Sequence, residues 1–257
     1  MFKAIPLFSG SSGNSVYIKY GDDEVLIDAG VSYKNLRLAL EKVGTDISNI
    51  KAIFVTHEHS DHVKGLPVMC KHCDIPVYIN EKSYSGMRLP DEDAFCEHAI
   101  VKNAGESVSV GDIYVKIFST PHDSSGSVGY RFDFSGGESF GYATDIGEVT
   151  TDIREGLYGC STVVLESNHD IGMLKNGPYP YILKKRILSD HGHLSNDACA
   201  EFIPELVDHN TSKVILAHLS LENNTPEIAY RTSAVALTEA GYTPEDVRLT
   251  VAMRSIL

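Results

Sequence analysis

A run of histidines and carboxylates offers the most chemistry in the amino-acid sequence. His-Glu-His-Ser-Asp-His occupies residues 57–62, between a strongly apolar segment and a helix-like one. In an extended chain, residues two apart point the same way, so His57 and His59 present two imidazoles to one point. Asp61 and His62 lie at the turn into the helix and can face a second point nearby. Imidazoles and carboxylates at such spacing suit Zn, Mn or Fe, so the run predicts a metal site.

Residues of the same types follow other apolar segments. Asp28 ends the segment 25–27, His122 follows 114–119, Asp145 follows 141–144, and His218 follows 214–217. Taken singly, each is better explained as a hydrogen-bonded loop histidine or a capping aspartate. Taken together with residues 57–62, they predict one site at an edge where the carboxyl ends of several strands converge.

The elements that must position these residues are indicated by apolar periodicity. Strands are predicted at 2–8, 15–20, 24–28, 51–56, several times within 107–143, and at 162–165, 214–217 and 247–251. Helices are predicted at 32–43, 183–188, 194–207 and 226–240. Strand-rich blocks that end in helices favour an α/β fold of two mixed sheets packed face to face, with helices outside. No linker, repeat or low-complexity segment interrupts the chain, so we expect a single domain over residues 1–257.

Composition limits the class of protein further. The chain has 257 residues, 42% of them hydrophobic and 22% charged, which is typical of a globular protein and excludes disorder, collagen and coiled coil. With 35 acidic and 22 basic residues the formal net charge is −13. This charge argues against nucleic-acid binding through a broad basic surface. Eleven histidines and no tryptophan direct attention to metal binding instead.

Five scattered cysteines form a poor disulfide framework, so a reducing cytoplasm is the expected location. Cys70-Lys-His-Cys73 has the spacing of half a zinc knuckle, and Cys96 and His98 are candidates for the other half. Small buried side chains on and after a helix are the simpler explanation. The sequence contains neither an apolar segment of signal-peptide type nor one long enough to span a membrane, and we expect no membrane partner.

In the order of its candidate ligands, the sequence resembles the metallo-β-lactamase fold hydrolases. Their motifs are an early Asp, H-x-H-x-D-H, a lone His, an Asp and a final His, which this chain matches with Asp28, residues 57–62, His122, Asp145 and His218. The resemblance spans most of the chain, and H-x-H-x-D-H is highly specific. It implies a four-layered αββα sandwich, in agreement with the strands and helices predicted above.

The resemblance also implies a ligand set for two divalent metal ions. His57, His59 and His122 would hold one ion, Asp61, His62 and His218 the second, and Asp145 would bridge them. Asp28 would orient the loop 57–62 from outside the ligand set, because ligating imidazoles must be held in place. Zinc is the default for a histidine-rich site, with manganese and iron as alternatives.

The chemistry expected of such a centre is hydrolysis. Two divalent ions about 4 Å apart can share a bridging hydroxide and clamp the oxygens of a phosphoryl or acyl centre. The ions lower toward neutrality the pKa of the water that gives this hydroxide, and we expect Asp61 to hydrogen-bond the hydroxide. The fold alone does not say which bond is cleaved.

Two later segments favour a phosphodiester. Glu166 follows the apolar residues 162–165, and His193 lies in Gly-His-Leu-Ser-Asn, residues 192–196. These segments resemble those of the tRNase Z and phosphodiesterase branch, in which a histidine faces a glutamate at the rim of the metal site. By that similarity His193 would protonate the leaving alkoxide, and Glu166 would orient it and keep it charged; a thiolate needs no such help. The alternative is that His193 bonds only to local backbone, with Ser195 as the helix N-cap.

Residues 9–15, 166–170 and 192–196 together resemble the YycJ (WalJ) family of bacterial proteins, which is associated with 5′-to-3′ exonuclease activity on DNA. The Ser/Gly loop 9–15 can offer backbone N–H groups to a phosphate or serve only as a flexible hairpin connection. The basic groups 184–186 and 71–72 can guide a strand or form solvated helix faces. Candidate substrate contacts are Ser12, Asn14, Asn168, His169, His191 and Ser195.

The sequence thus predicts a dinuclear metal-dependent phosphodiesterase, a 5′-to-3′ DNA exonuclease that uses a metal-bridging hydroxide. The alternative is a small-molecule hydrolase of a cyclic phosphodiester, lactone or thioester, which a narrow pocket closed by residues 171–181 would favour. A metal-bound regulatory module is disfavoured by the complete ligand set. Two bound dications would bring the formal charge of −13 to about −9, so we expect DNA affinity to reside at the metal centre rather than on a basic surface.

Overall fold

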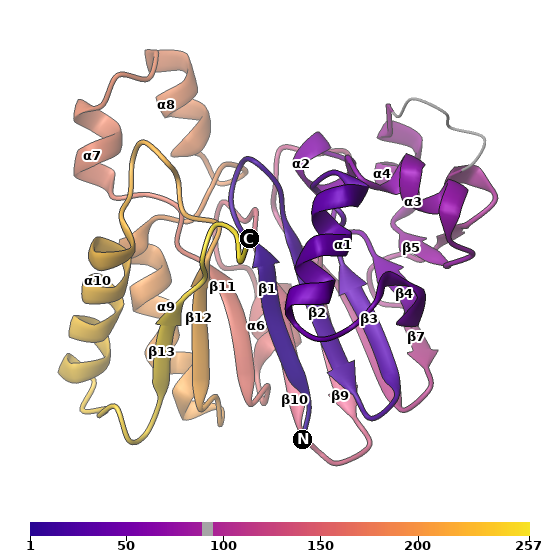
Figure 1. Cartoon of the computed structure of the whole chain (residues 1–257). Helices are drawn as coiled ribbons and strands as arrows, with labels where there is room; N and C mark the ends of the chain where they lie inside the picture. The colour runs from indigo at the N-terminus through magenta and orange to yellow at the C-terminus, as the bar shows by residue number, and fades with distance from the viewer. Residues whose placement is uncertain (89–94) are drawn as a thin grey trace.

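The computed structural model describes residues 1–88 and 95–257, whose strands form two sheets (Figure 1). The first sheet has the order β1 (Lys3–Phe8), β2 (Ser15–Tyr20), β3 (Asp23–Ile27), β4 (Ile50–Phe54), β5 (Val77–Ile79) and β6 (Ala99–Val101). The second has the order β13 (Arg248–Val251), β12 (Lys213–Ala217), β11 (Thr162–Glu166), β10 (Ser139–Ala143), β9 (Val128–Phe134), β8 (Ile113–Ser119) and β7 (Ser107–Val110).

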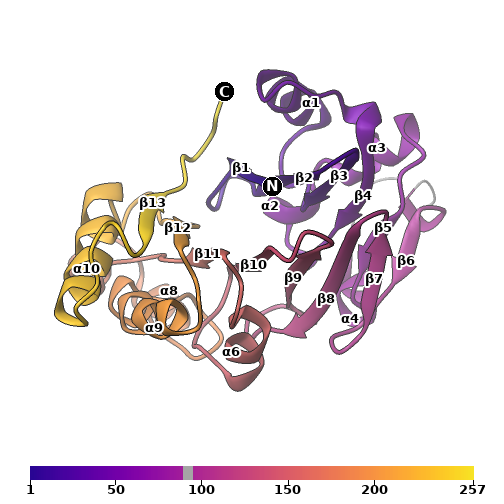
Figure 2. The same ribbon diagram turned by 90° about the horizontal axis from the view of Figure 1, so that it is seen from below.

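Helices cover the outer faces of both sheets. The first half of the chain contributes α1 (Tyr33–Lys42), α2 (Ser60–Val63), α3 (Leu66–His72) and α4 (Glu81–Gly86), with a short 3-10 turn at Ile47–Asn49. The second half contributes α6 (Thr151–Leu157), α9 (Asn196–Asp208) and α10 (Pro226–Glu239). Two further helices, α7 (Ile171–Asn176) and α8 (Tyr181–Ile187), lie beyond the ends of the strands (Figure 1). Figure 2 shows the sheets face to face, with α1 outside the first and α6, α9 and α10 outside the second.

Three separate apolar clusters fill the spaces between these layers. Neighbouring residues of β4 point to opposite faces, so Ile53 packs with Leu36 of α1 while Phe54 packs with Phe132 of the other sheet. On the far side, the second sheet packs against Phe202 of α9 and its neighbouring helices. Three clusters between four layers confirm the predicted αββα sandwich.

Most predicted elements lie within a residue or two of their expected ends, and α9 begins two residues later than predicted. The sequence places its start at 194, whereas the Ser195 hydroxyl accepts a hydrogen bond from the Ala198 amide and caps a helix that begins at Asn196. The Leu194 amide instead donates to the Glu166 carboxylate at 3.2 Å. The short elements β5, β6, α4, α6 and α7 were not predicted, because so few residues give little periodic signal.

Strand direction brings the polar ends of both sheets to one edge. In the first sheet β3 and β4 are parallel. In the second, β10, β11 and β12 are parallel, and β8 shares their direction because β9 is antiparallel to both β8 and β10. The residues that follow these strands therefore meet between the two sheets. None of the helices in the described part of the chain is long and apolar enough to cross a membrane.

Candidate metal centre

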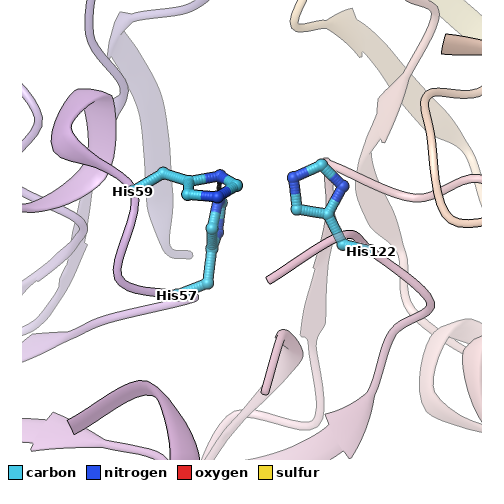
Figure 3. A group of neighbouring side chains, drawn as sticks. All are labelled: His57, His59 and His122. Atoms are coloured by element: carbon cyan, nitrogen blue, oxygen red, sulfur yellow. Dashed lines mark hydrogen bonds between the residues drawn. The ribbon is translucent and has the colours of Figure 1, made fainter. Parts of the chain in front are cut away.

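Three imidazoles form the first group of ligand atoms. His57 and His59 follow β4, and His122 approaches from the opposite sheet after β8 (Figure 3). One nitrogen of each ring lies within 4.8 Å of the others, and His57 Nε2 is 3.0 Å from His59 Nδ1. Burial and the neighbouring His62 imidazole lower the pKa of His57 well below its usual range, and burial also lowers the pKa of His122. Neutral imidazoles of this kind are able to bind a metal.

A second group joins Asp61 and His62 of α2 to His218, which follows β12. Their ligand atoms also lie within 4.8 Å of one another. His62 and His218 are buried, and the Asp61 side chain retains 24% of its exposure. The side-chain nitrogen Nδ2 of Asn14 lies 3.1 Å from His62 Nε2, so the loop after β1 closes over this group.

Asp145 lies between the two groups. Its carboxylate oxygens are 3.4 Å from His62 Nε2, 3.8 Å from His122 Nε2 and 3.5 Å from His218 Nδ1. Although burial opposes its ionisation, the His218 and His62 imidazoles hold the pKa of Asp145 well below its usual range. A buried carboxylate in contact with members of both groups has the placement that a bridging ligand requires.

Asp28 holds one of these imidazoles from behind. Its Oδ1 accepts the Thr56 amide at 2.8 Å, and its Oδ2 accepts the Thr56 hydroxyl at 2.9 Å and lies 2.8 Å from His62 Nδ1. A proton on Nδ1 directed at Asp28 leaves Nε2 of His62 facing the centre. The structure thus places Asp28 where the sequence predicts an orienting residue.

The backbone is unusual at three of these positions. Asp28, Asp145 and His218 have φ angles of 58°, 55° and 57°, and the only other described non-glycine residue with positive φ is Asn210. Left-handed backbone at a non-glycine residue costs free energy and concentrates at functional sites. Each of the three directly follows a strand or lies one residue beyond it, and the turn directs its side chain between the sheets.

Glu166, the last residue of β11, connects two histidines through one oxygen. Oε1 lies 2.8 Å from His193 Nδ1 and 2.9 Å from His218 Nδ1, while Oε2 accepts the Ile146 and Leu194 amides. Burial favours the neutral acid, but the imidazoles, His193 above all, lower the pKa of Glu166 to about 2. In return, against the effect of its own burial, the Glu166 carboxylate raises the pKa of His193 to about 9.

The donor set fits divalent metal ions. Asp145 Oδ2 and His218 Nε2 are buried and have no hydrogen-bond partner among the described residues, as expected of atoms that bind a metal. Burial opposes protonation of His62, yet Asp28 and Asp145 raise its pKa to about 10. The buried carboxylates therefore draw positive charge into the centre, which divalent cations would supply in place of a proton.

No cysteine belongs to the metal-type clusters found among the described residues. Cys70 is buried in the core between the first sheet and its helices, Cys73 lies 3.9 Å from the Tyr33 hydroxyl, and Cys96 accepts from Tyr84. His98 lies 3.6 Å from Asp74 instead of facing a thiol. The structure thus agrees with the simpler of the two explanations offered for Cys70 and Cys73.

The six candidate substrate contacts lie in different environments. Ser12 and His191 are exposed, and His191 lines a groove of about 510 Å³ that His122 also borders. Asn14 is buried beside the ligands, where its Oδ1 accepts the Gly10 amide. His169 is buried, with neither ring nitrogen hydrogen-bonded to a described residue.

Two of the six make hydrogen bonds within the protein. Asn168 is buried and donates to the His218 carbonyl at 2.8 Å, and the Ser195 hydroxyl caps α9, as the alternative explanation of this segment expected. Substrate contact by Asn168 and Ser195 stays a prediction. In the basic group 184–186, Lys184 donates to the backbone carbonyls of 175 and 177, and Arg186 pairs with Asp123.

Sequence reasoning missed Thr56 and Gly30. Thr56 directly precedes His57 and fixes Asp28, so its place beside the histidine run was the available signal. A Cβ on Gly30 would stand 1.7 Å from the Asp61 carbonyl oxygen and 2.6 Å from the Asn14 amide nitrogen. Only glycine allows Asp61 of α2 to pack this closely, and no local sequence pattern indicates the need for glycine at this position.

The chain resembles known proteins in both sequence and fold. The beta-lactamase superfamily domain matches residues 23–219. Exodeoxyribonuclease YycJ of Bacillus anthracis is 36% identical over 236 residues, 92% of this chain and 89% of that protein. Exodeoxyribonuclease WalJ of Streptococcus pneumoniae is 36% identical over 243 residues, 93% of this chain and 89% of that protein.

Among solved structures, Zn²⁺-bound PqqB from Methylobacterium extorquens has the same fold, with a TM-score of 0.72 and 16% identity over 100% of this chain and 99% of that one. The fold family and the ligand clusters together imply bound divalent metal ions. The chain therefore belongs to the YycJ/WalJ family of metal-dependent hydrolases in the beta-lactamase superfamily.

Proposed function

We propose that the chain is a dinuclear metal-dependent phosphodiesterase that removes nucleotides from DNA in the 5′-to-3′ direction. The carrying observation is the contact of His193 with Glu166 at the edge of the ligand clusters. The exodeoxyribonuclease names of the two relatives support DNA as the substrate.

Two ions, which we propose to be zinc, would be held by His57, His59 and His122 and by Asp61, His62 and His218, with Asp145 shared between them. When bound, the ions would supply Lewis acidity and would lower the pKa of a bound water, so that hydroxide is available as the nucleophile for hydrolysis. Asp28 and Glu166 would keep two of the ligating imidazoles in the correct tautomer.

His193 is placed to handle the proton of the leaving group. Its Nδ1 lies 2.8 Å from Glu166 Oε1, and against the effect of burial the Glu166 carboxylate raises the pKa of His193 to about 9, so at neutral pH the imidazolium also carries a proton on Nε2. The side chain retains 23% of its exposure. As the P–O3′ bond breaks, this proton passes to the departing deoxyribose oxygen. An alkoxide is a poor leaving group at neutral pH, and a general acid typically contributes about 10²–10⁴-fold in rate.

The groove that His122 borders suits a polynucleotide better than a small ligand. It is lined by hydroxyl and amide side chains, including Asn80, Ser124 and Ser125, together with Lys82. Such groups commonly contact phosphate and sugar without reading sequence. None of residues 171–181, the segment whose closure would favour a small-molecule hydrolase, lines this groove, although Tyr179 lines a separate cavity beside His218.

The test uses metal-loaded protein and end-labelled single- and double-stranded DNA. We expect release of nucleotides from the 5′ end, and His193→Ala should lower turnover about 10²–10⁴-fold with metal content unchanged. His209→Ala is the control, because His209 is exposed at the end of α9 and stacks on Tyr158. Absence of nucleotide release with both ions bound would overturn the proposal, and metal loss in His193→Ala would make His193 a ligand.

A further inference from the structure

A second cavity lies on the His218 side of the centre. It has a volume of about 310 Å³, within the range typical of small-ligand sites, and Leu219 and Ser9 line it. The Ser9 hydroxyl accepts the His218 amide at 2.8 Å, so the cavity directly adjoins a residue of the ligand clusters. The groove bordered by His122 lies at the other group of imidazoles.

One wall of this cavity is rich in hydrogen-bond donors. Ser11 and Ser12, exposed at the tip of the loop between β1 and β2, line it, and their amides donate to no atom of the described residues. Arg254 lines it too, and its guanidinium forms no ion pair within the described part of the chain. Successive free amides beside a guanidinium are a recurrent arrangement for binding phosphate.

The backbone holds this wall in place. The C-terminal segment leaves β13 and crosses to the end of β1, where Ser9 donates to the Arg254 carbonyl at 3.1 Å and Phe8 pairs with Ser255 (Figure 1). In the loop, Gly13 has φ +153°, and a Cβ there would stand 2.4 Å from Val31 Cγ1. The loop is therefore a packed structure rather than a flexible connection.

Apolar side chains line the same cavity. They belong to Tyr179 and Leu221, and the carboxylate-bearing Glu222 lines it too. An aromatic ring and an aliphatic side chain in one cavity with phosphate donors match a nucleotide, which carries a flat base and a sugar next to its phosphate.

We propose that this cavity binds the 5′-terminal nucleotide of the strand, with its phosphate monoester on the Ser11 and Ser12 amides and Arg254, and its nucleoside against Tyr179 and Leu221. The inference rests on the nuclease function proposed above. Binding of the terminal phosphate in this cavity would make the enzyme select 5′-phosphorylated ends, because a terminal hydroxyl lacks the charge that these donors recognise. Hydrogen bonds to a charged partner are worth enough to change affinity about 10- to 100-fold.

The first experiment measures binding by calorimetry to the full metal-loaded chain. The probes are deoxyadenosine 5′-monophosphate, deoxyadenosine and inorganic phosphate. We expect Arg254→Gln to weaken binding of the monophosphate about 10- to 100-fold, and Arg248→Gln, an exposed arginine on β13, to leave it unchanged. Equal binding of the monophosphate by the wild type and Arg254→Gln would overturn the proposal. If inorganic phosphate binds as tightly as the monophosphate, the proposed contact of Tyr179 and Leu221 with the nucleoside is overturned.

The second experiment compares rates on two 3′-labelled oligonucleotides that differ only in a 5′-phosphate or 5′-hydroxyl. We expect the wild type to favour the phosphorylated end about tenfold or more, and Arg254→Gln to lose that preference, whereas Arg248→Gln should keep it. Equal rates of the wild type on both ends, or preference for a 3′-phosphate, would overturn the assignment. If the monophosphate binds as expected but DNA is not cleaved, the cavity stands and the proposed nuclease function fails.

Discussion

Glu166→Gln changes one atom of the centre and forces a choice between two losses. The wild-type carboxylate accepts hydrogen bonds on both oxygens, from two imidazoles on Oε1 and from the Ile146 and Leu194 amides on Oε2. Glutamine offers one acceptor oxygen and one NH₂ group. If the oxygen faces the imidazoles, the NH₂ group opposes two backbone N–H groups, and an unpaired buried donor costs about 1–3 kcal/mol.

If the NH₂ group faces the imidazoles, the metal centre suffers instead. His218 Nδ1 must then accept a hydrogen bond, which moves its proton to Nε2, the buried atom that now has no hydrogen-bond partner among the described residues. A protonated Nε2 cannot bind a metal. Loss of such an orienting partner typically lowers metal affinity about 10- to 100-fold, which corresponds to about 1.4–2.7 kcal/mol.

Both outcomes are measurable on the same protein. Metal affinity and stoichiometry come from competition with a chromophoric chelator, and the free energy of unfolding comes from urea titration of the metal-loaded chain. Glu205→Gln is the matched control, because Glu205 pairs with Arg154 at the partly exposed outer face of α9. A Glu166→Gln protein that binds two ions with wild-type affinity and unfolds at the wild-type urea concentration would refute the hydrogen-bond argument.

Three further changes have expected outcomes. Gly30→Ala should destabilise the protein by about 1–3 kcal/mol or more and weaken metal binding, because the new Cβ meets the Asp61 carbonyl oxygen. Urea unfolding and metal titration measure both effects. Gly172→Ala is the control, since its Cβ meets only a side-chain oxygen at 3.1 Å. Burial raises the pKa of Asp23, but Lys51 at 2.6 Å and the backbone lower it overall, so this pair should stabilise the fold above about pH 4 and lose its effect as pH falls through the lowered pKa. Urea titrations at pH 7 and pH 3 should then show a smaller acid-induced loss for Asp23→Asn than for the wild type, and an equal loss would contradict the assignment. Removal of metal by a chelator should abolish hydrolysis and lower the melting temperature, both reversed by added zinc, whereas full activity after complete removal of metal would exclude a metal-dependent reaction.

The candidate ligands were predictable from sequence because each has a local signal. His57 and His59 lie in one short run, and the other candidates follow apolar strands, whose ends must meet at one edge once the sheets form. The contact of Glu166 with His193 was expected only through resemblance, since the two residues are far apart in sequence and come together through β11 and the start of α9.

The remaining features depend on contacts that leave no pattern in the sequence. Asn168 has a polar group of the kind that binds substrate, and only the folded chain shows that it donates to the His218 carbonyl. Arg254 was not predicted at all, because its place beside the loop after β1 depends on the path of the C-terminal segment. The sequence therefore indicates which residue types can bind a metal or a substrate, but not which of their polar groups are hydrogen-bonded within the fold.

The division of the ligand clusters between the sheets has a consequence for how the protein matures. His57, His59, Asp61 and His62 are carried by the first sheet, and His122, Asp145 and His218 by the second. The group of His57, His59 and His122 and the group of Asp61, His62 and His218 each take residues from both sheets, so neither of these two groups is complete until the sheets pack together. Metal uptake by these two groups during refolding should therefore follow docking of the two sheets, and its rate would report when the sandwich closes.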